Sequence, residues 1–170
     1  MVGKPIATCL AMLAFLASTS VALAAGSSNF PSGATLGAQP DLTIGPNPPD
    51  GPGYVLAQHC TPGAPFITFL LRVSNVGSIT SPEISDHTAV TATDTADLSW
   101  TTGTSLSALS AGQTQGVTLQ IPGRAGVSGE VEFQIVVNGR PWFDEASFAN
   151  NRMKIVVQIP PGSCGPAPQP

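Results

Sequence analysis

The chain has 170 residues, of which only 9% are charged, and its formal net charge is −4. Six basic residues against ten acidic ones leave no electrostatic footprint for nucleic acid, and no basic amphipathic helix suited to an anionic membrane. Sparse charge beside 18 glycines and 17 prolines is typical of an extracellular all-β domain with many turns.

The first 24 residues have the pattern of a secretory signal peptide. Lys4 precedes an apolar run over residues 7–16, and Ala22-Leu23-Ala24 is a small-x-small cleavage site. The run is too short for a membrane-spanning helix. The sequence therefore predicts cleavage after residue 24 and an exported chain without a membrane span, placed in the periplasm, at the cell surface or outside the cell.

A flexible arm is predicted over residues 25–39, which are rich in glycine, serine, alanine and proline. A short first strand follows at residues 41–44. Residues 45–65 then form a long connection with six prolines, and residues 54–57 within it fit a short extra strand. A connection of this length is unusual in a compact domain. It is either a functional loop or a cover for the edge of a sheet.

The remaining strands are predicted by the alternation of apolar and polar residues. In residues 66–74 the apolar side chains of Ile67, Phe69, Leu71 and Val73 share one face. Further strands are expected at 98–101, 117–121, 129–138 and 152–159, with one or two weaker ones within 79–94. About seven strands separated by short turn signals predict an all-β fold, a two-sheet antiparallel sandwich over residues 40–160. A proline-rich tail, residues 161–170, follows.

Two cysteines remain once Cys9 leaves with the signal peptide. Cys60 and Cys164 are too far apart for a CxxC redox pair or a zinc site. In an exported protein such a pair indicates a disulfide. The direction of the strands places both at one end of the sandwich, because Cys60 precedes the second main strand and Cys164 follows the last.

No set of catalytic side chains stands out, so the sequence predicts no enzyme, no cofactor and no metal. His59 and His87 are the only histidines. A thiol- or metal-dependent hydrolase built on them and on Cys60 is the alternative, and it requires a free thiol at Cys60.

The turn before the last strand is the best candidate for contact with a partner. A stretch of four residues in this turn contains Arg140, Trp142 and Phe143. Tryptophan and arginine are enriched at binding hot spots. Loops on a rigid sandwich are where such domains bind. The alternative is that Trp142 or Phe143 covers the open end of the core. Trp100, by contrast, is expected to pack in the core or over an edge.

Four polar residues close the same turn: Asp144, Glu145, Asn150 and Asn151. Asparagine side chains bond nearby backbone and tolerate left-handed conformations, so the pair at 150–151 suits the entry to a hairpin strand. The functional alternative is a calcium site made of the four side-chain groups, although the spacing is not that of an EF-hand loop.

Four segments, in this order, resemble the CARDB family, a cell-adhesion-related domain found in bacteria. They are residues 40–44 (PDLTI), 71–77 (LRVSNVG), 109–112 (LSAG), and the pairs 144–145 and 150–151. The resemblance implies an immunoglobulin-like sandwich in an exported bacterial protein and a role in adhesion, with a protein or a surface glycan as partner. A structural protein of the cell envelope, whose tails and 45–65 connection order against a neighbour, is the alternative.

Overall fold

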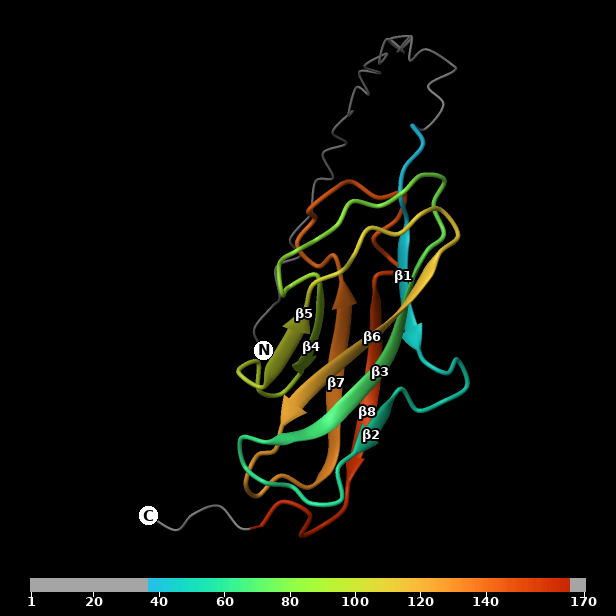
Figure 1. Ribbon diagram of the computed structural model, residues 1–170. Coiled ribbons are helices and arrows are strands. Elements are labelled where there is room, and N and C mark those ends of the chain that lie inside the picture. Colours follow the sequence, from blue (N-terminus) through green and yellow to red (C-terminus); the bar gives the residue numbers. More distant parts are fainter. Residues whose placement is uncertain (1–36, 166–170) are drawn as a thin grey trace, which may run out of the picture. The chain divides into compact units, whose positions relative to one another are not determined.

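In the computed structural model, residues 37–165 are described, and their fold is a sandwich of two antiparallel sheets (Figure 1). The predicted signal peptide and all but the last three residues of the predicted arm lie outside this range. The described residues contain no helix. They form eight strands: β1 (Leu42–Pro46), β2 (Tyr54–Leu56), β3 (Pro65–Asn75), β4 (Val90–Asp94), β5 (Thr101–Thr104), β6 (Thr114–Pro122), β7 (Gly129–Val137) and β8 (Arg152–Ile159). The predicted all-β sandwich is confirmed.

The strand β3 organises the first sheet. It pairs with β6 along one edge, whereas β1 and β2 share its other edge. β1 lies against residues 71–75 and β2 against residues 67–69. The second sheet has the order β5-β4-β7-β8. Among residues 37–165, then, no helix is long and apolar enough to cross a membrane.

The core lies between the two sheets and is built from the alternating residues of β3, β6, β7 and β8. Phe69 and Phe133 face each other across it with ring centroids 5.1 Å apart. Trp100 packs on Phe133 at 5.3 Å and is only 6% exposed, so its predicted place in the core is confirmed. The side chains predicted to face inward from β3 are all buried: Ile67, Phe69, Leu71 and Val73.

The long connection at residues 45–65 covers the edge of the first sheet. Besides the pairing of β2, the N–H of Asn47 donates to the carbonyl of Leu70, and the N–H of Leu70 donates to the carbonyl of Gly53. The hydroxyl of Tyr54 accepts the N–H of Gln158 in β8. The connection therefore covers the edge of β3, which is one of its two expected roles.

Of the two strand predictions in the middle of the chain, the one for residues 79–94 is confirmed and the one for residues 98–101 needs correction. Within residues 79–94 the only regular strand is β4, and the segment before it touches the chain at isolated bridges, such as Ile84 with Leu106. The strand expected at 98–101 is β5, which begins only at Thr101, the last residue of the predicted range. Asp97 is the reason, because its side chain accepts the N–H of Ser99 and its carbonyl accepts the N–H of Trp100, which fixes a turn.

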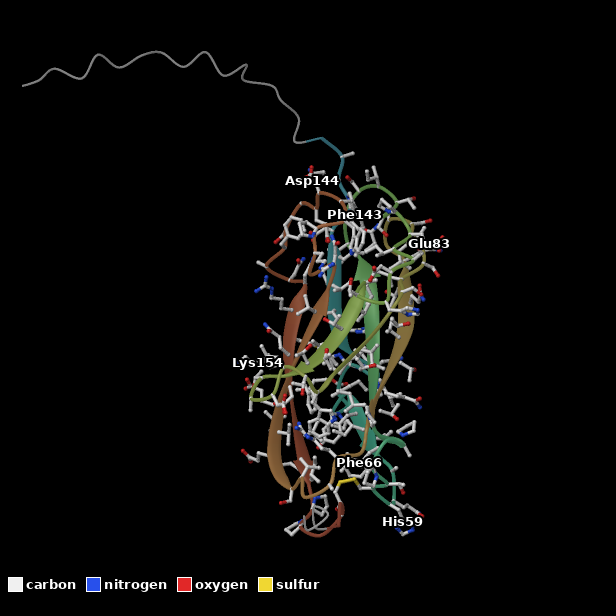
Figure 2. All side chains as sticks on the ribbon, turned by 90° about the vertical axis from the view of Figure 1, so that its left-hand side faces the viewer. His59, Phe66, Glu83, Phe143, Asp144 and Lys154 are labelled. Atoms are coloured by element: carbon white, nitrogen blue, oxygen red, sulfur yellow. A yellow bond between two sulfur atoms is a disulfide. The ribbon has the colours of Figure 1, made fainter. Side chains whose placement is uncertain are left out.

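Cys60 and Cys164 form the predicted disulfide. It lies at the end of the sandwich that carries His59 in Figure 2. The N–H of Gly126, in the connection between β6 and β7, donates to the carbonyl of Cys164. The inference from strand direction was therefore correct, and the bridge ties the start of β3 to the chain that leaves β8.

Candidate binding site at the β7–β8 loop

The β7–β8 loop, residues 138–151, leaves the sheet through an asparagine in the left-handed region. Asn138 has a φ of 48°, which asparagine tolerates better than most residues. Its N–H donates to the carbonyl of Ala89, and its Oδ1 accepts the N–H of Trp142. The turn that carries Trp142 is thus held from within by its first residue.

A buried carboxylate closes the loop. Glu145 is 6% exposed. Its Oε1 accepts Nδ2 of Asn138 at 2.5 Å and Nδ2 of Asn151 at 3.0 Å, while its Oε2 accepts the N–H of Leu42 at 2.6 Å. Burial of a carboxylate is costly unless donors surround it, and charge-assisted bonds are the strong ones. Glu145 therefore joins both ends of the loop to the start of β1.

A second buried side chain, Asn75, also holds loops together through hydrogen bonds; the hydrogen-bond clusters of Glu145 and Asn75 are called the two braces. Oδ1 of Asn75 accepts the N–H groups of Asp41 and Gly77, and its Nδ2 donates to the carbonyls of Ile79 and Leu109. A Cβ at Gly77 would lie only 2.4 Å from the carbonyl oxygen of Gln39, so the crossing of the two segments requires glycine there. All four hydrogen-bonding positions of the Asn75 amide are thus in use.

The segments that carry the family resemblance meet at these two braces. Nδ2 of Asn150 donates to the carboxylate of Asp41, and the N–H of Gly112 donates to the carbonyl of Asn75. Together with the bonds of Glu145, these contacts bring all four segments to one end of the sandwich. Their side chains hold loops together, which gives them a structural role that is independent of any ligand.

The arrangement around Glu145 differs from a calcium site. Both of its oxygens accept N–H groups, and Asn150 and Asn151 each direct Nδ2 to a carboxylate. Calcium requires six to eight oxygen ligands. Asp144 is exposed. Across residues 37–165 there is also no group of three or more His, Cys, Asp or Glu side chains placed to hold a metal.

The three residues predicted to make contact do not form one cluster. Trp142 is 48% exposed, whereas Phe143 packs partly against the core, so the expected covering of the core end applies to Phe143. Both line a pocket of about 350 Å³ that also has Glu83 and Asp86 in its wall. Figure 2 shows Glu83 and Phe143 at the same end, opposite His59. Arg140 lines a different pocket.

The residues of the hydrolase alternative lie apart. Cys60 is bound in the disulfide and carries no free thiol. His59 lies beside it in the sequence. His87 lies within the turn from Asp86 to Ala89, and the carbonyl of Ala89 accepts the N–H of Asn138 just past the far end of β7. β7 has nine residues, which is a separation of roughly 30 Å. The structure thus brings none of the three into a catalytic arrangement.

Sequence reasoning missed two side chains beside this loop. Phe148 is 41% exposed and lies between the acidic pair at 144–145 and the asparagine pair at 150–151, in a stretch for which no role was predicted. Arg152 is the first residue of β8 and lines the same pocket as Arg140. An aromatic residue between Ser147 and Ala149 in a polar loop was the available signal for Phe148.

An ion pair near the disulfide end provides a test of the electrostatics. Asp97 bonds the hydroxyl of Ser99 and lies 2.5 Å from Arg124, and these contacts, in that order, lower its pKa from 3.8 to about 2. Arg124 also lies over the ring of Trp100 at 5.8 Å, and the indole N–H of Trp100 donates to the carbonyl of Pro122. Asp97 thereby orients a cation over a core aromatic.

Replacing Asp97 with asparagine is expected to lower stability at neutral pH but not in acid. Because the pKa of Asp97 is lower in the folded state, its contribution is complete above about pH 4 and is lost as the pH falls through about 2. Urea midpoints of wild type and Asp97→Asn, measured across this range, should converge at the acid end. Asp144→Asn, at an exposed position, is the matched control, and a gap of constant size at every pH would contradict the assignment.

No family model, curated protein or solved structure matches this chain. The resemblance to CARDB domains therefore stays a prediction.

Proposed function

We propose that this protein is an exported, non-catalytic binding module that contacts a protein or a surface glycan through the β7–β8 loop. The observation that supports it is Trp142, a large aromatic side chain left half exposed on a loop that a buried carboxylate holds in place. A loop ordered before binding loses little conformational entropy when a ligand arrives. Rigid scaffolds with such loops are typical of recognition domains.

The pocket beside Trp142 favours some ligands over others. An aromatic face stacks on the apolar side of a sugar ring or on a cation. Glu83 and Asp86, which share the pocket with Trp142 and Phe143, supply acceptors for hydroxyl or ammonium groups and repel anions. The pocket is therefore suited to a neutral sugar or to a basic segment of a partner protein.

The alternative of a structural envelope protein loses one of its supports. It assumed that residues 45–65 become ordered against a neighbouring molecule. In the structure this connection is already ordered against β3 and β8 of its own chain. The binding proposal is thus the one that the geometry favours.

Replacing Trp142 with alanine is expected to reduce binding at least tenfold and to leave stability nearly unchanged. Truncation of a hot-spot tryptophan costs 2 kcal/mol or more of binding energy, whereas exposed substitutions change the free energy of unfolding by about 0.5 kcal/mol or less. A glycan array and a peptide array probed with the exported protein provide the readout, and thermal unfolding followed by circular dichroism gives the stability.

Leu98→Ala is the matched control. Leu98 is 73% exposed and lies near Asp97 at the other end of the sandwich, so its truncation removes exposed apolar surface far from the loop. Array signals that survive Trp142→Ala, or that fall equally in Leu98→Ala, would show that the β7–β8 loop is not the contact surface.

A further inference from the structure

Two pockets on the outer face of the second sheet share a wall. The first, called the arginine pocket here, measures about 350 Å³ and is lined by Thr88, Thr91, Gln134, Val136, Gly139, Arg140 and Arg152. The second, the Phe148 pocket, measures about 220 Å³ and is lined by Val136, Val137, Asn138, Gly139, Pro141, Phe148, Asn151 and Arg152. Three residues belong to both, namely Val136, Gly139 and Arg152. The pockets therefore adjoin.

The arginine pocket concentrates positive charge in an acidic protein. Residues 37–165 contain five basic side chains, and Arg124 and Lys154 each form an ion pair, with Asp97 and Glu132. Arg140 and Arg152 form no ion pair within the described residues, although both line one pocket.

Asp86 acts electrostatically on this pocket from outside its lining. Asp86 lies within electrostatic range of Arg140 without pairing with it, and it lines the Trp142 pocket instead. Two planar guanidinium groups match the geometry of a carboxylate, which each can bind through two parallel hydrogen bonds. The hydroxyl of Thr91 and the amide of Gln134 add donors in the same wall. The chemistry of the arginine pocket is thus that of an anion site.

The Phe148 pocket has the opposite character. Its walls include Phe148, Pro141 and Val136, and Phe148 is 41% exposed. Asn138 and Asn151 also line it, and both are held by Glu145, so the pocket is formed before any ligand binds. At Gly139 an added Cβ would lie 2.9 Å from Cγ1 of Val136, so glycine preserves the wall that the two pockets share.

We propose that the two pockets form one site for an amphipathic carboxylate. The apolar part of the ligand lies against Phe148, and its carboxylate lies between Arg140 and Arg152. Ligand sites are typically about 300–1,000 Å³. The arginine pocket alone, at about 350 Å³, lies at the low end of this range, and the Phe148 pocket adds about 220 Å³ of apolar space, which fits a ligand the size of one residue. The C-terminal residue of a peptide and a free aryl or alkyl carboxylic acid share this chemistry. The site goes beyond the proposed function, because Trp142 lines a different pocket.

The test uses N-acetylphenylalanine and its amide, which differ only in the carboxylate. Titration calorimetry or NMR with the exported, oxidised protein should show at least tenfold tighter binding of the acid. Arg152→Gln and Arg140→Gln should each remove most of this difference. Arg72→Gln, at an exposed arginine on the other sheet, is the matched control and should not change it. Phe148→Ala should weaken the binding of N-acetylphenylalanine and leave the binding of acetate unchanged.

Each further outcome has one meaning. A peptide ending in phenylalanine that binds tighter than N-acetylphenylalanine identifies a protein C-terminus as the source, and equal affinity identifies a free acid. Equal binding of acid and amide, no binding at millimolar concentration, or an unchanged affinity in folded Arg152→Gln would overturn the proposal. Binding of oligogalacturonate alone, without N-acetylphenylalanine, would overturn it too. Trp142→Ala should leave the acid bound, so this site and the proposed function fail separately.

Discussion

Replacing both Cys60 and Cys164 with alanine is expected to lower the free energy of unfolding by about 4–5 kcal/mol. The two cysteines are 104 residues apart in sequence. A bridge over so long a loop removes much of the conformational entropy of the unfolded chain, and the effect grows with the logarithm of loop length. This is a large fraction of the stability of a typical domain.

Urea unfolding of three samples measures the effect: the oxidised wild type, the reduced wild type and the double variant. The reduced wild type should coincide with Cys60→Ala/Cys164→Ala, because both lack the covalent loop but keep the same core. The double variant is needed because a single substitution would leave one unpaired thiol, and Cys164 is only 4% exposed. A loss below about 1 kcal/mol would show that the unfolded chain is already constrained without the bridge.

The strands that could be predicted are those in which burial on one face imposes alternation. β3, β6, β7 and β8 each bury every second residue, and their sequences show it. The residues of β5, by contrast, are Thr-Thr-Gly-Thr, which carry no such pattern. The start of β5 depends on the turn at Asp97, and the error in predicting it came from treating Trp100 as part of a strand.

The candidate site could be predicted only in part. The position of Trp142 in a polar turn left open whether it is exposed or covers the core, and no local pattern showed that Arg140 lines a different pocket from Trp142. The role of Glu145 in holding the loop could not be predicted from local sequence either. Its partners come from three segments, and Leu42 lies 103 residues away, so no local pattern marks this glutamate as buried.

The segments behind the family resemblance show how a sequence signal can have a structural cause. Asn75 and Gly77 belong to the second of these segments, residues 71–77. Their actual constraint is the crossing of residues 39–41, which leaves no space for a side chain at Gly77 and supplies an N–H to Asn75. Such contacts would favour the same residues in any sandwich with this crossing, whatever it binds.

Replacing Glu145 with alanine is expected to lower the free energy of unfolding by about 3–5 kcal/mol, because each buried donor left without an acceptor costs about 1–3 kcal/mol. The change leaves three buried donors without their acceptor: Nδ2 of Asn138, Nδ2 of Asn151 and the N–H of Leu42. Glu145→Gln keeps the volume of the side chain but turns an amide N–H toward one of these donors. It should therefore also be destabilising, by about 2–3 kcal/mol.

Asp144→Ala is the matched control, because the neighbouring acid is exposed and should change stability by about 0.5 kcal/mol or less. Hydrogen exchange should show the loss of protection in Glu145→Gln concentrated at the amide of Trp142 and its neighbours, since Asn138 accepts that amide. The binding attributed to Trp142 should weaken with it, because the loop would have to become ordered as the ligand binds. A Glu145→Gln variant as stable as Asp144→Ala would mean that the buried carboxylate does not hold the loop, and the preorganised surface proposed here would lose its physical basis.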